Sequence, residues 1–187
     1  LRETLAAMLL RVADWEPGMS LVDPMCGSGT FPIEAALRSA GTTSARGRGF
    51  DCEKWCKYKA FGLHPEPIPS AIYGSDRNQQ TIESAKRNAD RAGVQPALER
   101  MDACSVRAPS DRGLLICNPP YGRRTKNPMA YQQLGRLLTT EFKAWSAGII
   151  ISSPNALNAL NRRPTRLVKI NNGGLKLKFA VLAPERI

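Results

Sequence analysis

The sequence has few of the residues that build metal centres and disulfide frameworks. It contains one histidine, His64, and five cysteines, an odd number for a set of disulfides. These counts predict free thiols in a reducing compartment, the cytoplasm. Cys52 and Cys56 lie one helical turn apart before His64, which raises a zinc site. No Cys-x-x-Cys or histidine pair completes four ligands, so we predict no metal and favour an ordinary helix with two small residues on one face.

Apolar runs that approach membrane-spanning length are also missing, so we predict no membrane partner. The segment Leu1–Trp15 predicts an amphipathic helix with no basic leader or cleavage site. There is no internal repeat and no low-complexity segment. Hydrophobic residues make up 42% of the 187 residues, which predicts one domain over residues 1–187. Because the chain starts at Leu1 and not at Met, we expect it to be part of a longer protein.

Acidic residues are scarce relative to basic ones. Lys and Arg number 27 against 16 for Asp and Glu, which gives a formal net charge of +11. This balance predicts a polyanionic partner, a nucleic acid ahead of a membrane surface. A generally basic enzyme with no such partner is the alternative, because net charge concerns association and not fold.

Short runs rich in Val, Ile and Leu alternate with helical patterns, which is typical of an α/β fold with a parallel sheet covered on both faces. The tail differs, because alternating apolar and polar residues flank Asn172-Gly173-Gly174 and predict an antiparallel hairpin with one buried face. A further helix is expected over residues 51–61. The strands are expected at 20–23, 71–76, 97–103, 113–118 and 148–153, and the intervening helices at about 30–39, around 82–89 and over 131–145.

The segment DPMCGSGTF, residues 23–31, follows the first strand and contains two glycines, Gly27 and Gly29. Such a turn brings backbone N–H groups and a helix N-terminus close to a ligand, so it predicts a nucleotide-like cofactor. The third glycine of the dinucleotide fingerprint is missing, since Pro32 and its neighbours stand there, and pyrophosphate binding is not supported. The alternative is a plain strand-to-helix turn.

Polar side chains follow four predicted strands: Asp23, Asp76, Asp102 and Asn118. Open α/β sheets bind ligands at the carboxyl ends of their strands, where these four would meet. Asp76 is placed to accept the hydroxyls of a ribose, and Asp102 to accept an adenine amino group. Each of these two carboxylates could instead be a helix cap or a solvated acid at a strand end.

The segment ICNPPYGRR, residues 116–124, breaks an apolar strand with Asn118 and two prolines. Consecutive prolines remove two backbone donors and hold the chain extended, so the segment predicts a rigid arm at the sheet edge. A strand terminator with a packing tyrosine is the alternative for residues 118–121. A solvated loop is the alternative for Arg123, Arg124 and Lys126.

These motifs together resemble the class I S-adenosylmethionine-dependent methyltransferases. The chain is most similar to the large-subunit rRNA guanine-N2 methyltransferase L family of bacteria and its tRNA relatives, in which an RNA-binding THUMP domain precedes the catalytic domain. The resemblance spans essentially the whole chain. It rests on LRETLAAMLL (1–10), DPMCGSGTFPIEAA (23–36), GSDRN (74–78), DA (102–103), NPPYG (118–122) and NGGLKLKF (172–179).

The resemblance implies a Rossmann-like, seven-stranded, mostly parallel sheet that ends in the hairpin, with helices on both faces. It implies S-adenosylmethionine as the cofactor and S-adenosylhomocysteine as the product. It also implies a THUMP domain in the same polypeptide, before Leu1. The cofactor-binding residues that it implies are Asp23, Pro24, Cys26, Gly27, Ser28, Gly29, Thr30, Asp76, Arg77, Asp102, Ala103 and Asn118. In this family the NPPY motif, here Asn118, Pro119, Pro120 and Tyr121, binds the amino group to be methylated.

The chemistry of the motif suits an exocyclic amine, whose lone pair is spread into the base ring. The Asn118 side-chain carbonyl and the Pro119 backbone carbonyl are expected to accept the two N–H protons and aim the lone pair at the methyl group. Tyr121 would stack on the base, and Arg123, Arg124 and Lys126 would hold phosphates. We therefore predict methylation of guanine N2 in rRNA or tRNA. The alternatives are adenine N6 of DNA, a glutamine amide of a protein, an inactive nucleic-acid-binding module and an NAD-dependent oxidoreductase; the target nucleotide and the oligomeric state stay open.

Overall fold

The computed structural model describes residues 1–42, 66–120 and 129–185. Within these ranges, no helix combines the length and the apolar character needed to cross a membrane. The helices are α1 (Glu3–Val12), α2 (Thr30–Ser39), α3 (Gln79–Ala92), the 3-10 helix η2 (Ala103–Ser105), α4 (Met129–Thr139) and α5 (Pro154–Asn158). The strands are β1 (Ser20–Asp23), β2 (Ile72–Asp76), β3 (Ala97–Arg100), β4 (Gly113–Cys117), β5 (Ser146–Ile151), β6 (Arg166–Asn172) and β7 (Leu175–Leu182).

The strands form one seven-stranded sheet in the order β3-β2-β1-β4-β5-β7-β6. The pairs β1–β2, β2–β3, β1–β4 and β4–β5 are parallel, whereas β7 runs antiparallel to both of its neighbours. The strand order reverses between β1 and β4, which is where open α/β sheets leave a crevice at their carboxyl edge. The α/β class, the mostly parallel sheet and the terminal antiparallel hairpin are thereby confirmed.

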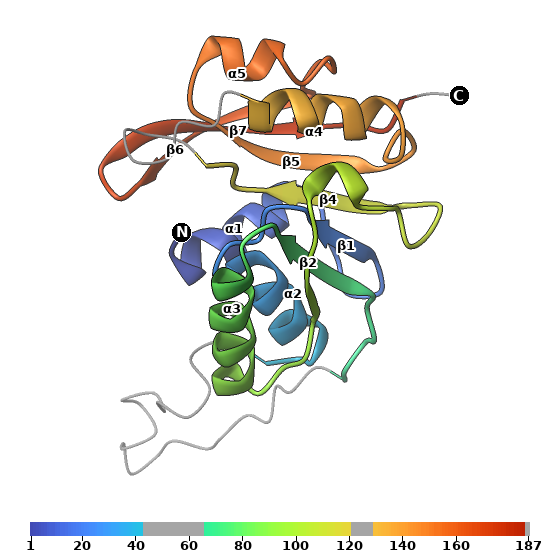
Figure 1. Cartoon of the computed structure of the whole chain (residues 1–187), viewed down its shortest axis with the longest axis vertical. Helices are drawn as coiled ribbons and strands as arrows, with labels where there is room; N and C mark the ends of the chain where they lie inside the picture. The colour runs from blue at the N-terminus through green and yellow to red at the C-terminus, as the bar shows by residue number, and fades with distance from the viewer. Residues whose placement is uncertain (43–65, 121–128, 186–187) are drawn as a thin grey trace, which may run out of the picture.

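Helices cover the two faces of the sheet and bury a separate core on each (Figure 1). On one face, α4 and α5 pack against residues such as Leu115 and Ile149; on the other, α1 and α2 pack against residues such as Leu114 and Ile150. All five residues of β4 are buried. This double burial explains why the central strands read as continuous apolar runs instead of alternating ones.

The terminal hairpin forms as its sequence predicts. Gly173 and Gly174 have φ angles of +59° and +82° and join Asn172 of β6 to its partner Leu175 of β7. Two consecutive positive φ angles suit the tight turn that matches the twist of the flanking strands, and glycine adopts them without steric cost.

Several boundaries differ from the sequence-based expectation. The third strand ends at Arg100, so Asp102 lies beyond it as the cap of η2. Helix α4 ends at Thr139, and Phe142 and Trp145 lie in the following turn, where their rings meet edge to face at 5.1 Å. Both aromatic side chains are nevertheless buried. They continue the helical spacing of apolar residues, and the helix predicted from the sequence was therefore too long.

The remaining differences concern the last third of the chain. Strand β5 begins at Ser146, two residues earlier than expected, and stops at Ile151. Ser153 then caps the short helix α5 by accepting the N–H of Ala156 at 3.2 Å, a helix that the sequence patterns did not predict. The helix expected over residues 51–61 lies outside the described residues.

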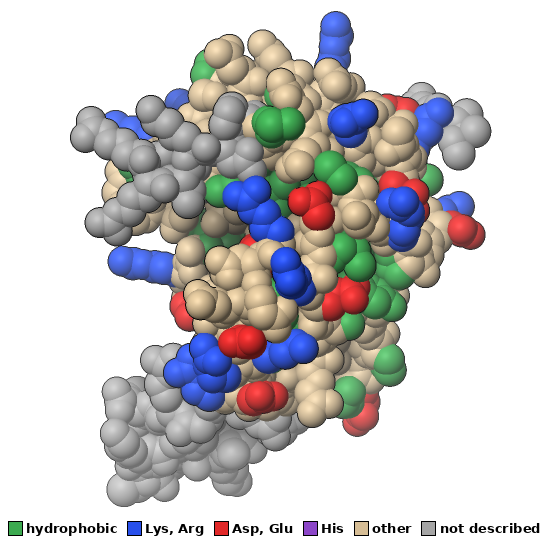
Figure 2. All heavy atoms as spheres, in the orientation of Figure 1, with side chains coloured by type: hydrophobic (Ala, Val, Ile, Leu, Met, Phe, Trp, Pro, Cys, Tyr) green, Lys and Arg blue, Asp and Glu red, His purple; other side chains and the backbone are tan. Residues whose placement is uncertain are grey.

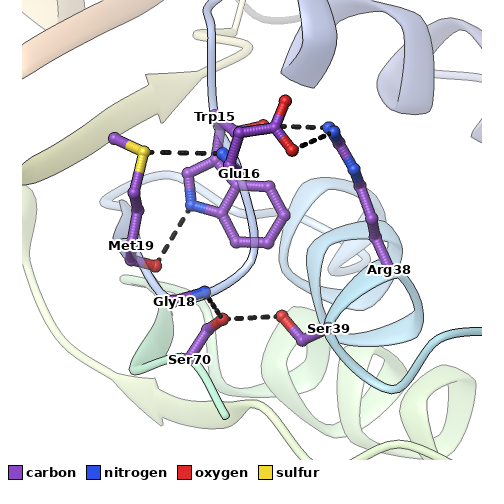
Figure 3. A network of polar contacts seen from close by, with 7 residues as sticks. All are labelled: Trp15, Glu16, Gly18, Met19, Arg38, Ser39 and Ser70. Carbon is purple, nitrogen blue, oxygen red and sulfur yellow. Dashed lines mark hydrogen bonds and ion pairs between the residues drawn. The ribbon is translucent and has the colours of Figure 1, made fainter. Parts of the chain in front are cut away.

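A polar network fixes the approach to β1 (Figure 3). Trp15 is fully buried, and its indole N–H donates to the Met19 carbonyl at 3.2 Å. Arg38 of α2 donates to the Trp15 carbonyl at 2.9 Å and pairs with Glu16 at 2.6 Å. These residues directly precede β1, so the network holds the amino end of the strand, whereas the pocket described below lies at its carboxyl end.

Candidate active site at the carboxyl edge of the sheet

A pocket of ≈ 300 Å³ lies at the carboxyl edge of the parallel strands. The segments that follow β1, β2, β3 and β4 all contribute to it, which is the arrangement expected at the switch point of an α/β sheet. Its lining residues are Pro24, Met25, Gly27, Asp76, Arg77, Asn78, Thr81, Asp102, Ala103, Asn118, Pro120 and Gln133.

The two glycines of the loop after β1 have different functions. Both have positive φ, +55° at Gly27 and +86° at Gly29. A Cβ atom at Gly29 would lie 3.1 Å from the Cβ of Ala85, so this glycine allows α2 and α3 to pack closely. A Cβ atom at Gly27 would meet nothing within 4 Å, and Gly27 lines the pocket. The loop therefore presents open backbone to a ligand at Gly27.

Asp76 joins this loop to the end of β2. Its Oδ2 atom accepts the Gly27 N–H at 3.2 Å, and its Oδ1 atom accepts the Asn78 N–H at 2.9 Å. Asn78 in turn caps α3 by accepting the N–H of Gln80 at 2.9 Å. Each carboxylate oxygen keeps a second lone pair, so Asp76 is held in place while it can still accept hydrogen bonds from a ligand in the pocket.

Asp102 and Ala103 form the wall of the pocket after β3. The Asp102 Oδ1 atom accepts the Cys104 N–H at 2.9 Å and caps η2, and the side chain is exposed. The helix cap and the binding residue, which the sequence left as alternatives, are therefore compatible: one oxygen caps η2 and the side chain lines the pocket.

Asp23, the last residue of β1, directly precedes the lining residue Pro24 and is only 1% exposed. Its Oδ1 atom accepts the Met25 N–H at 3.1 Å, and the Cys117 thiol of the neighbouring strand donates to its carboxylate. Burial, reinforced by the negative charge of Asp76, raises the pKa of Asp23 from 3.8 to about 8. The same burial raises the pKa of the Cys117 and Cys26 thiols, so neither is a reactive thiolate.

We expect Asp23 to make the free protein less stable as the pH rises. The unfolded chain releases this proton near pH 3.8 and the folded chain near 8, so between these values the folded state binds more protons and its free energy of unfolding falls. Asp23→Asn removes this titrating group. The fall in the free energy of unfolding between pH 5 and pH 9 should therefore be smaller in the variant, by an amount on the order of 2 kcal/mol. Urea unfolding from pH 5 to pH 9 measures this, with the exposed Asp111→Asn as control; parallel curves for wild type and Asp23→Asn would rule it out.

Asn118 follows β4 directly and brings an unsatisfied polar atom to the pocket. Its Oδ1 atom is buried, and no described residue donates a hydrogen bond to it. Pro119 is buried behind it and Pro120 lines the pocket. A buried carbonyl without a donor costs about 1–3 kcal/mol, so this oxygen is a candidate acceptor for a hydrogen bond from a ligand.

The structure brings together part of the set of residues singled out in the sequence. Pro24, Gly27, Asp76, Arg77, Asp102, Ala103, Asn118 and Pro120 line the pocket. Asp23, Cys26, Ser28, Gly29, Thr30 and Pro119 lie next to these residues along the chain but do not line it. Tyr121, Arg123, Arg124 and Lys126 lie outside the described residues, as do Cys52, Cys56 and His64.

Four lining residues were missed in the sequence: Met25, Asn78, Thr81 and Gln133. Asn78 could have been found, because an asparagine one residue before a helical pattern signals a cap close to the end of the strand. Gln133 could not, since its position depends on how α4 packs across the sheet.

The sequence model of the UPF0020 family, described as an RMKL-like methyltransferase domain, matches residues 1–180. The chain belongs to this family. A relative from Synechocystis, named as a candidate RNA methyltransferase, is 32% identical over 192 residues that cover 94% of this chain and 50% of the relative. The ribosomal RNA large subunit methyltransferase K/L of Aliivibrio salmonicida is 35% identical over 201 residues, which cover 94% of this chain and 28% of that protein.

A solved structure agrees with the family assignment. SMU.472, determined in complex with S-adenosylhomocysteine, matches with a TM-score of 0.87 and 27% identity over 99% of this chain and 53% of its own. The RMKL-like methyltransferase domain thus has a class I methyltransferase fold and S-adenosylmethionine as its cofactor. It spans half or less of the length of the curated relatives named above.

The pocket suits this cofactor on structural grounds. An adenosyl group needs acceptors for its ribose hydroxyls and a close approach to backbone, which Asp76 and Gly27 offer. Asp102 and Ala103 lie on the adjoining wall.

Proposed function

We propose that the protein transfers a methyl group from S-adenosylmethionine to an exocyclic amine of an RNA base, namely guanine N2 of rRNA or tRNA. The single observation that supports this most strongly is the buried, unsatisfied Oδ1 atom of Asn118 at the pocket. Any N–H or O–H group can satisfy such an oxygen, and an exocyclic amine is a donor of this kind with two N–H groups.

The residues at the end of β4 position the amine. The Asn118 Oδ1 atom accepts one of its N–H protons and the Pro119 carbonyl accepts the other. Because Pro119 and Pro120 cannot donate and have fixed φ, the two acceptors keep their relative positions. Hydrogen bonds to both N–H groups favour a nitrogen whose lone pair, which the base ring otherwise withdraws, points into the pocket. As the N–C bond forms and the S–C bond of the donor breaks, S-adenosylhomocysteine leaves and the methylated nitrogen releases its extra proton to solvent.

The remaining residues hold the cofactor, which when bound supplies an electrophilic methyl group on a positively charged sulfur. Asp76 accepts from the ribose hydroxyls, with Arg77 beside it. Asp102 and Ala103 receive the adenine. The loop from Asp23 to Thr30 supports the rest of the molecule through the backbone at Gly27 and the neighbouring residues Pro24, Cys26, Ser28 and Gly29.

Several features favour RNA as the substrate. The relatives named above include a ribosomal RNA methyltransferase, and the net charge of +11 suits a polyanion. Lys and Arg side chains are spread over the face shown in Figure 2, with acidic side chains between them. We propose that Tyr121 stacks on the target base and that Arg123, Arg124 and Lys126 hold its phosphates, and that a THUMP domain of the same polypeptide adds RNA affinity.

Transfer of labelled methyl groups tests the substrate class. The purified protein is incubated with labelled S-adenosylmethionine and separately with total rRNA, tRNA, duplex DNA and total protein. We expect label in rRNA or tRNA. Label in DNA alone would move the assignment to adenine N6, label in protein alone to a glutamine amide, and binding of S-adenosylhomocysteine without any transfer would indicate an inactive module.

A further inference from the structure

One face of the β6–β7 hairpin carries Lys169, Lys176 and Lys178, and no described helix packs over them. We call these three residues the hairpin lysines. Lys169 pairs directly with Lys178 across the two strands, and Asn171 pairs with Lys176, so the three lysines share one face. All three are exposed, whereas Leu177 and Phe179, on the opposite face, are buried in the core that α1 covers.

The described part of the chain places no acidic partner on the hairpin lysines. None of the three forms an ion pair with a described residue, and the sequence contains no Asp or Glu between Glu141 and Glu185. Like charges placed directly opposite each other on two strands destabilise the pair. Lys169 opposite Lys178 is therefore an arrangement that an anionic partner would stabilise.

The strand register places these lysines at the edge that bears the pocket. Cys117 of β4 pairs with Ile149 of β5, and Ile149 also pairs with Ala180 of β7. Two residues closer to the carboxyl end of β5, Ile151 pairs with Lys178. Lys178 is therefore level with the chain just after Asn118 and two strand spacings away, about 10 Å. Cys117, Ile149 and Ala180 belong to the same core, so Lys178 and Lys176 continue the face of the sheet that α4 covers.

The helices on this face leave the hairpin lysines free. The core beneath α4 and α5 includes Ala180 and Leu182 of β7 but no residue of β7 before Ala180. In Figure 1 the turn between β6 and β7 projects past these helices at the left end of the sheet. The uncovered face therefore starts where the helices stop and extends outward from the pocket edge.

We propose that the hairpin lysines bind the phosphate backbone of the RNA strand next to the target nucleotide. This inference rests on the proposed function, because it uses the position of Asn118 as the place of the target base. A phosphate chain entering the pocket edge passes the cross-strand pair Lys169 and Lys178 and the neighbouring Lys176, whose ammonium groups neutralise it without reading its sequence. The hairpin lysines then act on strand placement and not on the chemical step.

The test removes the three charges and keeps the side-chain length: Lys169→Gln, Lys176→Gln and Lys178→Gln together. The matched control removes three exposed charges elsewhere, with Lys86→Gln, Arg112→Gln and Arg136→Gln. The probe is fragmented total rRNA, and its binding to each complete protein is titrated from 50 to 300 mM salt. Binding of S-adenosylhomocysteine and thermal unfolding show that each variant is folded.

We expect the hairpin variant to bind rRNA about 10-fold more weakly at low salt and its plot of log affinity against log salt to lose about 2 from its slope. The KM for RNA should rise by a similar factor with kcat within about twofold of the wild type, while the control variant changes both quantities less. A hairpin variant that matches the control in slope and KM overturns the inference and leaves the proposed function standing. A wild type that transfers methyl to no RNA overturns the proposed function.

Discussion

Replacing Asn118 with alanine should slow methyl transfer about 100- to 1000-fold while donor affinity stays within about threefold of the wild type. The variant loses the buried oxygen that accepts one proton of the target amine, so the lone pair is no longer held toward the methyl group. Substrate and donor still bind through other residues. Single-turnover transfer to RNA gives the rate, and calorimetry with S-adenosylhomocysteine gives the affinity.

Two further variants show whether the loss comes from the acceptor. Asn118→Asp keeps an oxygen at the same position, so it should transfer methyl groups at least 10-fold faster than Asn118→Ala. Asn158→Ala, in α5, removes the same side chain at an exposed position that does not line the pocket and should leave the rate unchanged. Near-normal transfer by Asn118→Ala would exclude Asn118 from amine positioning.

Replacing Asp76 with alanine should weaken the binding of S-adenosylhomocysteine by about 100-fold or more. Two charge-assisted hydrogen bonds to ribose hydroxyls would be lost, each about 1.5–3 kcal/mol, and the Gly27 and Asn78 N–H groups would lose their acceptor. The loop after β1 and the start of α3 would then both be less well positioned for the cofactor.

The matched control is Asp90→Ala, which removes an exposed carboxylate from α3. Thermal unfolding of both variants separates loss of binding from loss of the fold. An Asp76→Ala protein that is folded and binds S-adenosylhomocysteine as the wild type does would show that the ribose lies elsewhere.

Much of the fold was predictable because each central strand is buried on both faces. β4 is an uninterrupted apolar run for that reason. The hairpin was visible because, in its outer half, buried Leu177 and Phe179 alternate with exposed Lys176 and Lys178. The end of α4 was not predictable, since Phe142 and Trp145 pack into the same core from a turn and keep the helical spacing of apolar residues. Helix α5 has five residues, too few to show a period.

The position of the candidate site could be predicted from the polar residues at strand ends, but the details that depend on packing could not. Asp76 and Asn118 were found because polar residues after buried strands meet at one edge. Three features of the site depend on contacts between distant segments and could not be predicted. Asp102 caps a 3-10 helix, Gln133 reaches the pocket, and the Asn118 oxygen is buried with no donor among the described residues. The roles of Tyr121, Arg123, Arg124 and Lys126 stay predictions.

Nucleoside mass spectrometry of the modified RNA is the most direct test of amine positioning by Asn118. RNA is incubated with S-adenosylmethionine and either wild type or Asn118→Ala, digested, and each methylated nucleoside is assigned to the atom that carries the methyl group. We expect N2-methylguanosine with the wild type and at least 100-fold less of it with Asn118→Ala. A methyl group on a ring carbon, a ring nitrogen or a ribose oxygen, or equal N2-methylguanosine from both proteins, would contradict it.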